Sequence, residues 1–150
     1  MEFATFLEQT DPADVIVDVK LPNGTTVCSL TLRPCDRTAL DTLRKQAQKS
    51  VVNPKTRQSE TQLDDGKLRE GLIRQCVVGW DGMTYGSAAL AMGRKPKGEA
   101  TADSDKVLPF AVDTAVRVLG SMIGIEDLIW TASLQRVEAE AKAEADEKNA

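Results

Sequence analysis

The sequence predicts an α+β fold: an N-terminal β-hairpin, then a mainly α-helical body of about four helices and a charged C-terminal helix. Three observations predict it. β-branched residues flank an Asn-Gly pair near the N-terminus, apolar residues recur at helical spacing further on, and the last residues are rich in Ala, Glu and Lys. With 150 residues, the chain is expected to be a single domain overall. Within it we distinguish a hairpin region (1–35), a helical body (36–137) containing a long loop (81–109), and an acidic tail (138–150).

The predicted hairpin occupies residues 14–32, after a short lead-in. Residues 1–13 contain Phe3, Phe6 and Leu7, which could form part of a helical turn; the alternative is a frayed terminus that docks weakly on the core. The hairpin turn is expected at Asn23-Gly24, since both residue types tolerate positive φ. Because an isolated two-stranded hairpin is marginal in water, this one must pack on helices, pair with a third strand or pair with another chain.

The first helix is expected over 36–50, capped by Asp36 or Thr38, whose side-chain oxygens can accept an early helical N–H. The next segment, 51–63, is polar and interrupted by Pro54, so it predicts a linker or flexible loop.

The clearest helical pattern covers 64–80 and begins at Asp64-Asp65. Its apolar residues follow the spacing of one buried helix face: Leu68, Leu72, Ile73, Cys76 and Val77. The loop 81–109 follows, punctuated by glycines and Pro96, with one possible helical turn at residues 88–92. A loop of this length inside a compact domain is usually functional or disordered.

Two more helices are expected over 110–148. One apolar stripe contains Val112, Val116, Leu119 and Ile123, and a second contains Ile125, Leu128, Ile129, Ala132 and Val137. The tail from residue 138 has five acidic and two basic residues, a net charge of −3, and no large apolar face. We expect a solvated helix that frays, or a segment that orders on a partner.

Composition argues against several function classes. The chain has no His, which removes Ser-His and Cys-His nucleophile pairs and any His-containing zinc site. Its formal net charge of −4 disfavours nucleic-acid binding. Cys28, Cys35 and Cys76 form no CxxC pair, so we expect free, mostly buried thiols in a reducing compartment. We expect no signal peptide, because Glu2, Glu8 and Asp11 lie where a cationic and then an apolar segment would be, and no apolar run is long enough for a membrane span.

Motif inspection predicts no catalytic, cofactor-binding or metal-binding residue. The acidic pairs Asp64-Asp65 and Glu126-Asp127 fit helix starts better than cation sites, because adjacent helical residues face different directions. The glycines of 82–98 have no P-loop or Rossmann context. The basic cluster at residues 94–97 is either a solvated face or a contact for an acidic partner segment.

Exposed aromatic and Met side chains are the remaining candidates for function, as anchors for a protein partner. Each could instead belong to the core. The candidate partner-binding residues are Trp80, Met83, Tyr85, Met92, Phe110 and Trp130.

The order of motifs resembles that of the tail assembly chaperones of long-tailed (siphovirus-type) bacteriophages and prophages. The first motif is Val78-Gly79-Trp80-Asp81-Gly82 at the end of the clearest helical pattern, and the second is Leu108-Pro109-Phe110. A charged C-terminus closes on Lys148-Asn149. The resemblance is best over residues 64–149 and looser over the hairpin.

This resemblance implies a non-enzymatic late protein of the host cytoplasm, not expected in the mature virion. It would bind the tape measure protein, and possibly the major tail tube protein, and keep the tape measure protein soluble during tail assembly. Homo-oligomers are compatible with it. Such genes often encode a longer frameshifted product, which would join at the acidic tail. The alternatives are a structural virion component (tube, terminator or connector), and an enzyme or small regulator of host function.

Overall fold

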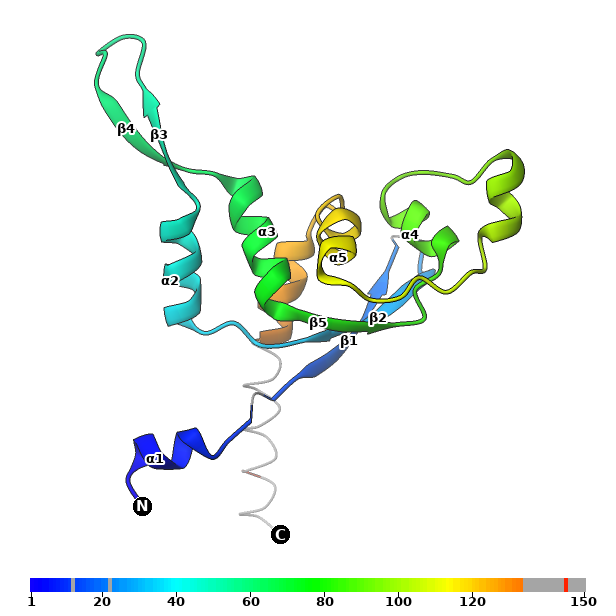
Figure 1. The fold of residues 1–150 in the computed structure, drawn as a ribbon, viewed down its shortest axis with the longest axis horizontal. Coiled ribbons are helices and arrows are strands. Elements are labelled where there is room, and N and C mark those ends of the chain that lie inside the picture. Colours follow the sequence, from blue (N-terminus) through cyan, green and yellow to red (C-terminus); the bar gives the residue numbers. More distant parts are fainter. Residues whose placement is uncertain (12, 22, 134–144, 146–150) are drawn as a thin grey trace.

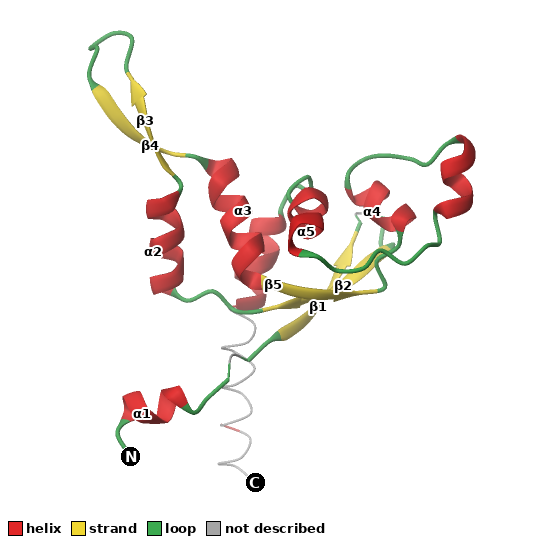
Figure 2. Ribbon diagram, viewed as in Figure 1, coloured by secondary structure: helices red, strands yellow, loops and turns green. Residues whose placement is uncertain are grey.

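The computed structural model describes residues 1–11, 13–21, 23–133 and 145 of the chain. Helices and strands are interleaved along the sequence (Figure 1, Figure 2). In order, the elements are α1 (Phe3–Glu8), β1 (Val15–Lys20), β2 (Thr26–Leu32), α2 (Arg37–Gln46), β3 (Gln48–Val52), β4 (Ser59–Leu63), α3 (Asp65–Cys76), β5 (Val77–Asp81), α4 (Tyr85–Ala91), the 3-10 helix η1 (Gly98–Asp103) and α5 (Val112–Leu119). A further helix begins at Ile125 and is described to residue 133.

The expected N-terminal hairpin is present and forms part of a three-stranded antiparallel sheet of order β1-β2-β5. Val17 lies opposite Leu30, which in turn lies opposite Trp80. The turn is closed by the N–H of Leu21, which donates to the Thr25 carbonyl, and Gly24 adopts a φ of 87° there. The third strand, β5, pairs with the edge of β2 that β1 leaves free. Pairing with a third strand is one of the three means of stabilisation expected for this hairpin.

The predicted arrangement of an N-terminal hairpin followed by a mainly helical body is wrong, because strands recur between the helices. The first correction is β5, which takes residues expected at the end of a helix spanning 64–80. Val77 fits both readings, since it continues the apolar face of α3 and also has high β-propensity. Pairing with β2 decides between them: the helix ends at Cys76 and the chain extends from Val77.

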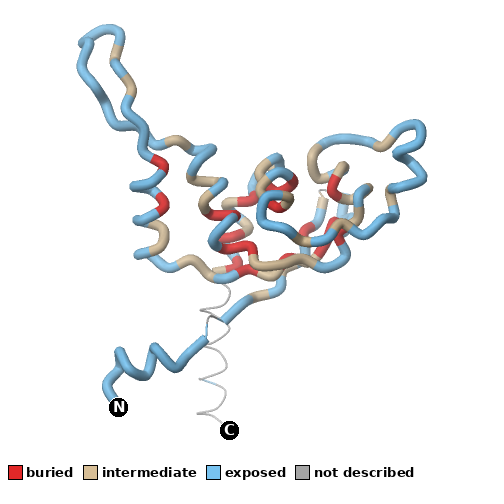
Figure 3. The backbone as a smooth tube through the Cα atoms, in the orientation of Figure 1, coloured by how far each residue is buried: buried red, intermediate tan, exposed pale blue. Residues whose placement is uncertain are grey.

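The second correction is the β3–β4 hairpin, which occupies the segment expected to be a linker and the end of the first expected helix. Its loop is organised by Asn53, whose side-chain amide donates to Glu60 at 2.9 Å and whose side-chain oxygen accepts from the Lys55 N–H at 2.9 Å. Every residue of the two strands is exposed except half-buried Val51. The hairpin projects away from the rest of the molecule (Figure 1, Figure 3).

Helix starts follow the expected capping chemistry. The Asp36 carboxylate accepts from the Ala39 N–H at 2.7 Å and caps α2. The Asp64 carboxylate accepts from the Lys67 N–H at 3.2 Å and caps α3. Each cap satisfies one of the N–H groups that the first helical turn leaves without a partner.

The core lies where the sheet meets α3, α5 and the helix from Ile125 (Figure 3). Its most buried large side chains are aliphatic or sulfur-containing: Leu30, Leu32, Leu72, Ile73, Met83, Leu119, Ile125 and Ile129. The apolar stripe predicted for α3 is buried or half-buried, and so are the described members of the stripe predicted for the last helix; Val137 lies outside the described residues. The stripe predicted for α5 is wrong in part, because Leu119 is buried but Val112 and Ile123 are exposed. The buried face of α5 is formed by Ala115, Val118 and Leu119.

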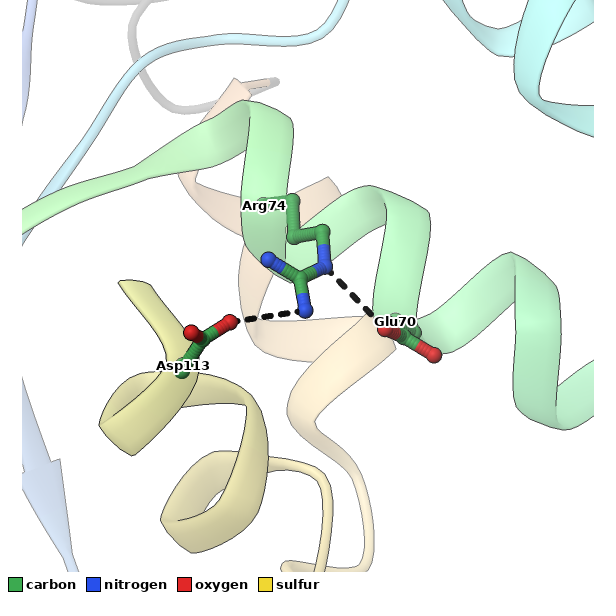
Figure 4. Close-up of polar contacts among 3 residues, drawn as sticks. All are labelled: Glu70, Arg74 and Asp113. Atoms are coloured by element: carbon green, nitrogen blue, oxygen red, sulfur yellow. Dashed lines mark hydrogen bonds and ion pairs between the residues drawn. The ribbon is translucent and has the colours of Figure 1, made fainter. Parts of the chain in front are cut away.

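Ion pairs join α3 to α5 and to the helix that begins at Ile125. The Arg69 Nε donates to Glu126 at 2.5 Å. Arg74 bridges Glu70, at 3.1 Å, and Asp113 at the start of α5, at 2.9 Å (Figure 4). The hydrogen bonds to Asp113 and Glu70 raise the pKa of the Arg74 guanidinium above its ordinary value.

Two further sequence-based predictions concern the long loop within the helical body and the tail that follows it. The long loop 81–109 is partly ordered by α4, η1 and a bridge between Thr84 and Val107. The acidic tail predicted for 138–150 lies outside the described residues except for residue 145. Within the described ranges, no helix has the length and apolar character that a membrane crossing needs.

Candidate partner-binding surface

Trp80 and Phe110 bring the two motifs of the sequence into direct contact. The Trp80 Nε1–H donates to the Leu108 carbonyl at 2.9 Å. The two rings meet edge to face, with centroids 5.2 Å apart and an interplanar angle of 88°. Both side chains are half-buried against the core. This contact anchors the return of the 82–109 segment on β5, so the two aromatics have a structural role.

A groove opens beside this anchor, between α4 and α5. Its volume is about 290 Å³, the scale of one or two bulky side chains. Six apolar or aromatic residues and two arginines line it: Tyr85, Ala88, Ala89, Met92, Leu108, Val118, Arg94 and Arg117.

Local sequence explains why α4 presents this face. Thr84 and Ser87 form a reciprocal capping box that begins the helix. Tyr85, Ala89 and Met92 are spaced by four and three residues, which places them on one side of the helix. At Gly86 a Cβ atom would lie 3.0 Å from the Ser104 carbonyl oxygen, so glycine permits the close approach of the returning chain.

The rim of the groove is positively charged. Arg94 and Arg117 are both exposed, and Arg94 begins the basic cluster 94–97. Neither arginine takes part in the ion pairs found within the described residues, which use other cations. Acidic residues follow on the same segment, but Asp103 is paired with Lys106 at 3.3 Å. The groove therefore offers apolar contact beside two available guanidinium groups.

The six sequence-predicted partner-binding residues do not form one surface. Tyr85 and Met92 line the groove. Met83 is 1% exposed and belongs to the core, so it has no surface to offer a partner. Trp80 and Phe110 form the anchor described above, and Trp130 lines a separate cleft of about 240 Å³ next to the start of α2.

Several groove residues were not predicted from the sequence. Ala89 lies in the segment that the sequence predicts as a loop, and Leu108 belongs to one of the two motifs. Arg117 and Val118 come from α5, a separate helix. The one available signal was the basic cluster 94–97, whose alternative interpretation was a contact for an acidic partner segment.

The three cysteines are free thiols. Burial, with a smaller contribution from Asp18, raises the pKa of Cys28 to about 11. Burial, with the neighbouring Cys35, raises the pKa of Cys76 to about 12. Burial also raises the pKa of Cys35 against an opposing hydrogen bond with Cys76. A high thiol pKa lowers the thiolate fraction at neutral pH and so lowers reactivity.

No cluster of three or more Cys, Asp or Glu side chains suited to a metal ion occurs in the part of the chain that the structure describes. Comparisons of the chain with protein-family models, with curated proteins and with solved structures found no match in any of the three.

Proposed function

We propose that this chain is a non-enzymatic phage tail assembly chaperone that binds the tape measure protein through the α4–α5 groove. It acts in the host cytoplasm, keeps its client soluble during tail assembly and stays out of the mature particle. The observation that carries the proposal is an open apolar groove with a basic rim, next to the contact that joins the two motifs on which the resemblance rests.

The groove has the chemistry that a long, aggregation-prone helical client needs. An amphipathic helix binds such a groove through apolar anchors spaced by three or four residues. The unbranched Met92 side chain can adapt to different anchors, which suits a chaperone that binds several segments of one client. Arg94 and Arg117 add a preference for segments that carry acidic residues beside the apolar ones.

Co-expression with the tape measure protein of the same genome tests this proposal. The client is expected to be insoluble alone and to co-purify in solution with the native chain. Tyr85→Glu, which places a charge in the groove, should abolish co-purification. Leu90→Glu is a matched control, because Leu90 is also 47% exposed on α4 but does not line the groove. Equal rescue of the client by both variants would contradict the assignment of the groove.

A structural virion component is the second candidate, and the projecting β3–β4 hairpin favours it. An exposed hairpin can add strands to the sheet of a neighbouring subunit, including a tail tube protein. The two candidates differ in what the particle contains. Mass spectrometry of purified virions should find no peptide of this chain if it is a chaperone, and stoichiometric amounts if it is structural.

A further inference from the structure

The N-terminal helix α1 carries an apolar face that no other described residue of the chain buries. Phe3, Phe6 and Leu7 are spaced by three and four residues and therefore lie on one side of the helix. Their exposed fractions are 72%, 52% and 50%, and α1 contains no buried residue. The two Phe rings stack with centroids 6.3 Å apart. A contiguous patch of this kind on a small protein usually marks an interaction site.

The charge of this segment is the opposite of that around the groove. Residues 1–11 contain Glu2, Glu8 and Asp11 and no Lys or Arg. The groove is lined by Arg94 and Arg117, beside the other basic residues of the cluster 94–97. Apolar side chains flanked by carboxylates on one element thus match apolar side chains flanked by guanidinium groups on the other.

The two elements lie at opposite ends of the three-stranded sheet (Figure 1). The chain passes from α1 into β1 at Val15, which pairs with Leu32. It passes into α4 after Asp81, which pairs with Ser29 in the middle of β2. The apolar face of α1 therefore lies apart from the groove of its own chain, and its exposed side chains are open to a second molecule.

We propose that α1 of one copy docks in the α4–α5 groove of a second copy. The Phe side chains of α1 fill the apolar floor, and Glu2 and Glu8 face Arg94 and Arg117. Because the two surfaces differ, the contact is heterologous and leaves one free groove and one free α1 on each pair, so further copies can add. One part of this inference rests on the proposed function. If the groove binds the client, a second copy occupies the groove until the client displaces it.

Light scattering coupled to size-exclusion chromatography, on the full chain without any client, tests the contact. The native chain should form oligomers whose mass rises with concentration. Phe6→Glu and Tyr85→Glu should each be monomeric, and both positions are exposed enough to leave folding intact. Leu90→Glu should assemble like the native chain. A native chain that stays monomeric would overturn the proposal.

Mixing the two defective variants gives the decisive result. Phe6→Glu keeps an intact groove and Tyr85→Glu keeps an intact α1, so a head-to-tail contact predicts a mixed dimer that stops growing. Absence of that dimer would overturn the proposal even if the single variants are monomeric. The solubility of the tape measure protein is measured in a separate co-expression experiment, in which Phe6→Glu should still keep this client soluble. If Phe6→Glu loses self-association but still solubilises the client, the proposed function is retained.

Discussion

The contribution of the Trp80–Phe110 contact to the free energy of unfolding can be predicted, because the contact consists of a hydrogen bond, an edge-to-face ring pair and buried ring surface. Trp80→Phe removes the hydrogen bond to the Leu108 carbonyl and keeps an aromatic ring, so it should cost about 1 kcal/mol. Trp80→Ala also removes the edge-to-face pair, worth about 1 kcal/mol, and part of the buried ring surface. Full burial of Trp would make the loss about 3–5 kcal/mol, and half-burial places the expected total near 3 kcal/mol.

The assay is urea unfolding followed by far-ultraviolet circular dichroism on Trp80→Ala, Phe110→Ala and the double variant. The coupling energy from the cycle should be about 1 kcal/mol, because the two rings touch directly. The reasoning would be refuted by a Trp80→Ala loss below about 0.5 kcal/mol or by a coupling energy near zero. A small loss for Trp80→Ala would mean that this side chain contributes little to the fold, and zero coupling would mean that the two rings do not stabilise each other.

Three further predictions concern thiols, a cap and an ion pair. The fold raises the pKa of Cys28 to about 11 and that of Cys76 to about 12, from an ordinary value of 9.0, so the free energy of unfolding should fall as pH rises from 9. At pH 8 both thiols of the folded protein should react with maleimide far more slowly than the thiols of the protein unfolded in urea. Equal reaction rates would contradict this. Asp64→Ala should cost about 1 kcal/mol in thermal or urea unfolding through loss of the α3 cap, and an unchanged midpoint would count against it. Burial alone would raise the pKa of Glu126, but the hydrogen bond from Arg69 holds it below its ordinary value. The stabilisation is therefore present above pH 4.5 and lost at lower pH, so Glu126→Gln should destabilise at pH 7 and converge with the native chain in acid.

Local signals in the sequence predicted those parts of the fold that local interactions determine. The Asn23-Gly24 turn and the caps Asp36 and Asp64 are short-range features, and each is found where the residues indicate. β5 was missed because Val77 fits a helical and an extended pattern equally, and only the distant strand β2 decides between them. β4 was missed because its residues, Ser59–Leu63, are mostly polar and lie on no buried face.

The candidate site could be predicted only in part, for a similar reason. Tyr85 and Met92 were recognised by residue type, as adaptable or aromatic anchors. Arg117 and Val118 come from another helix and reach the groove only because α5 packs beside α4. Met83 has the same residue type as Met92 but faces inward, a distinction that depends on the direction in which the chain leaves β5.

Photo-crosslinking tests directly whether the α4–α5 groove binds the tape measure protein. Benzoylphenylalanine is placed at position 85 in the groove, or at position 90 as the equally exposed control on the same helix, during co-expression with the tape measure protein. We expect a crosslink to the tape measure protein from position 85 and none from position 90. Equal crosslinking from both positions, or none from position 85 in a complex that still forms, would contradict it.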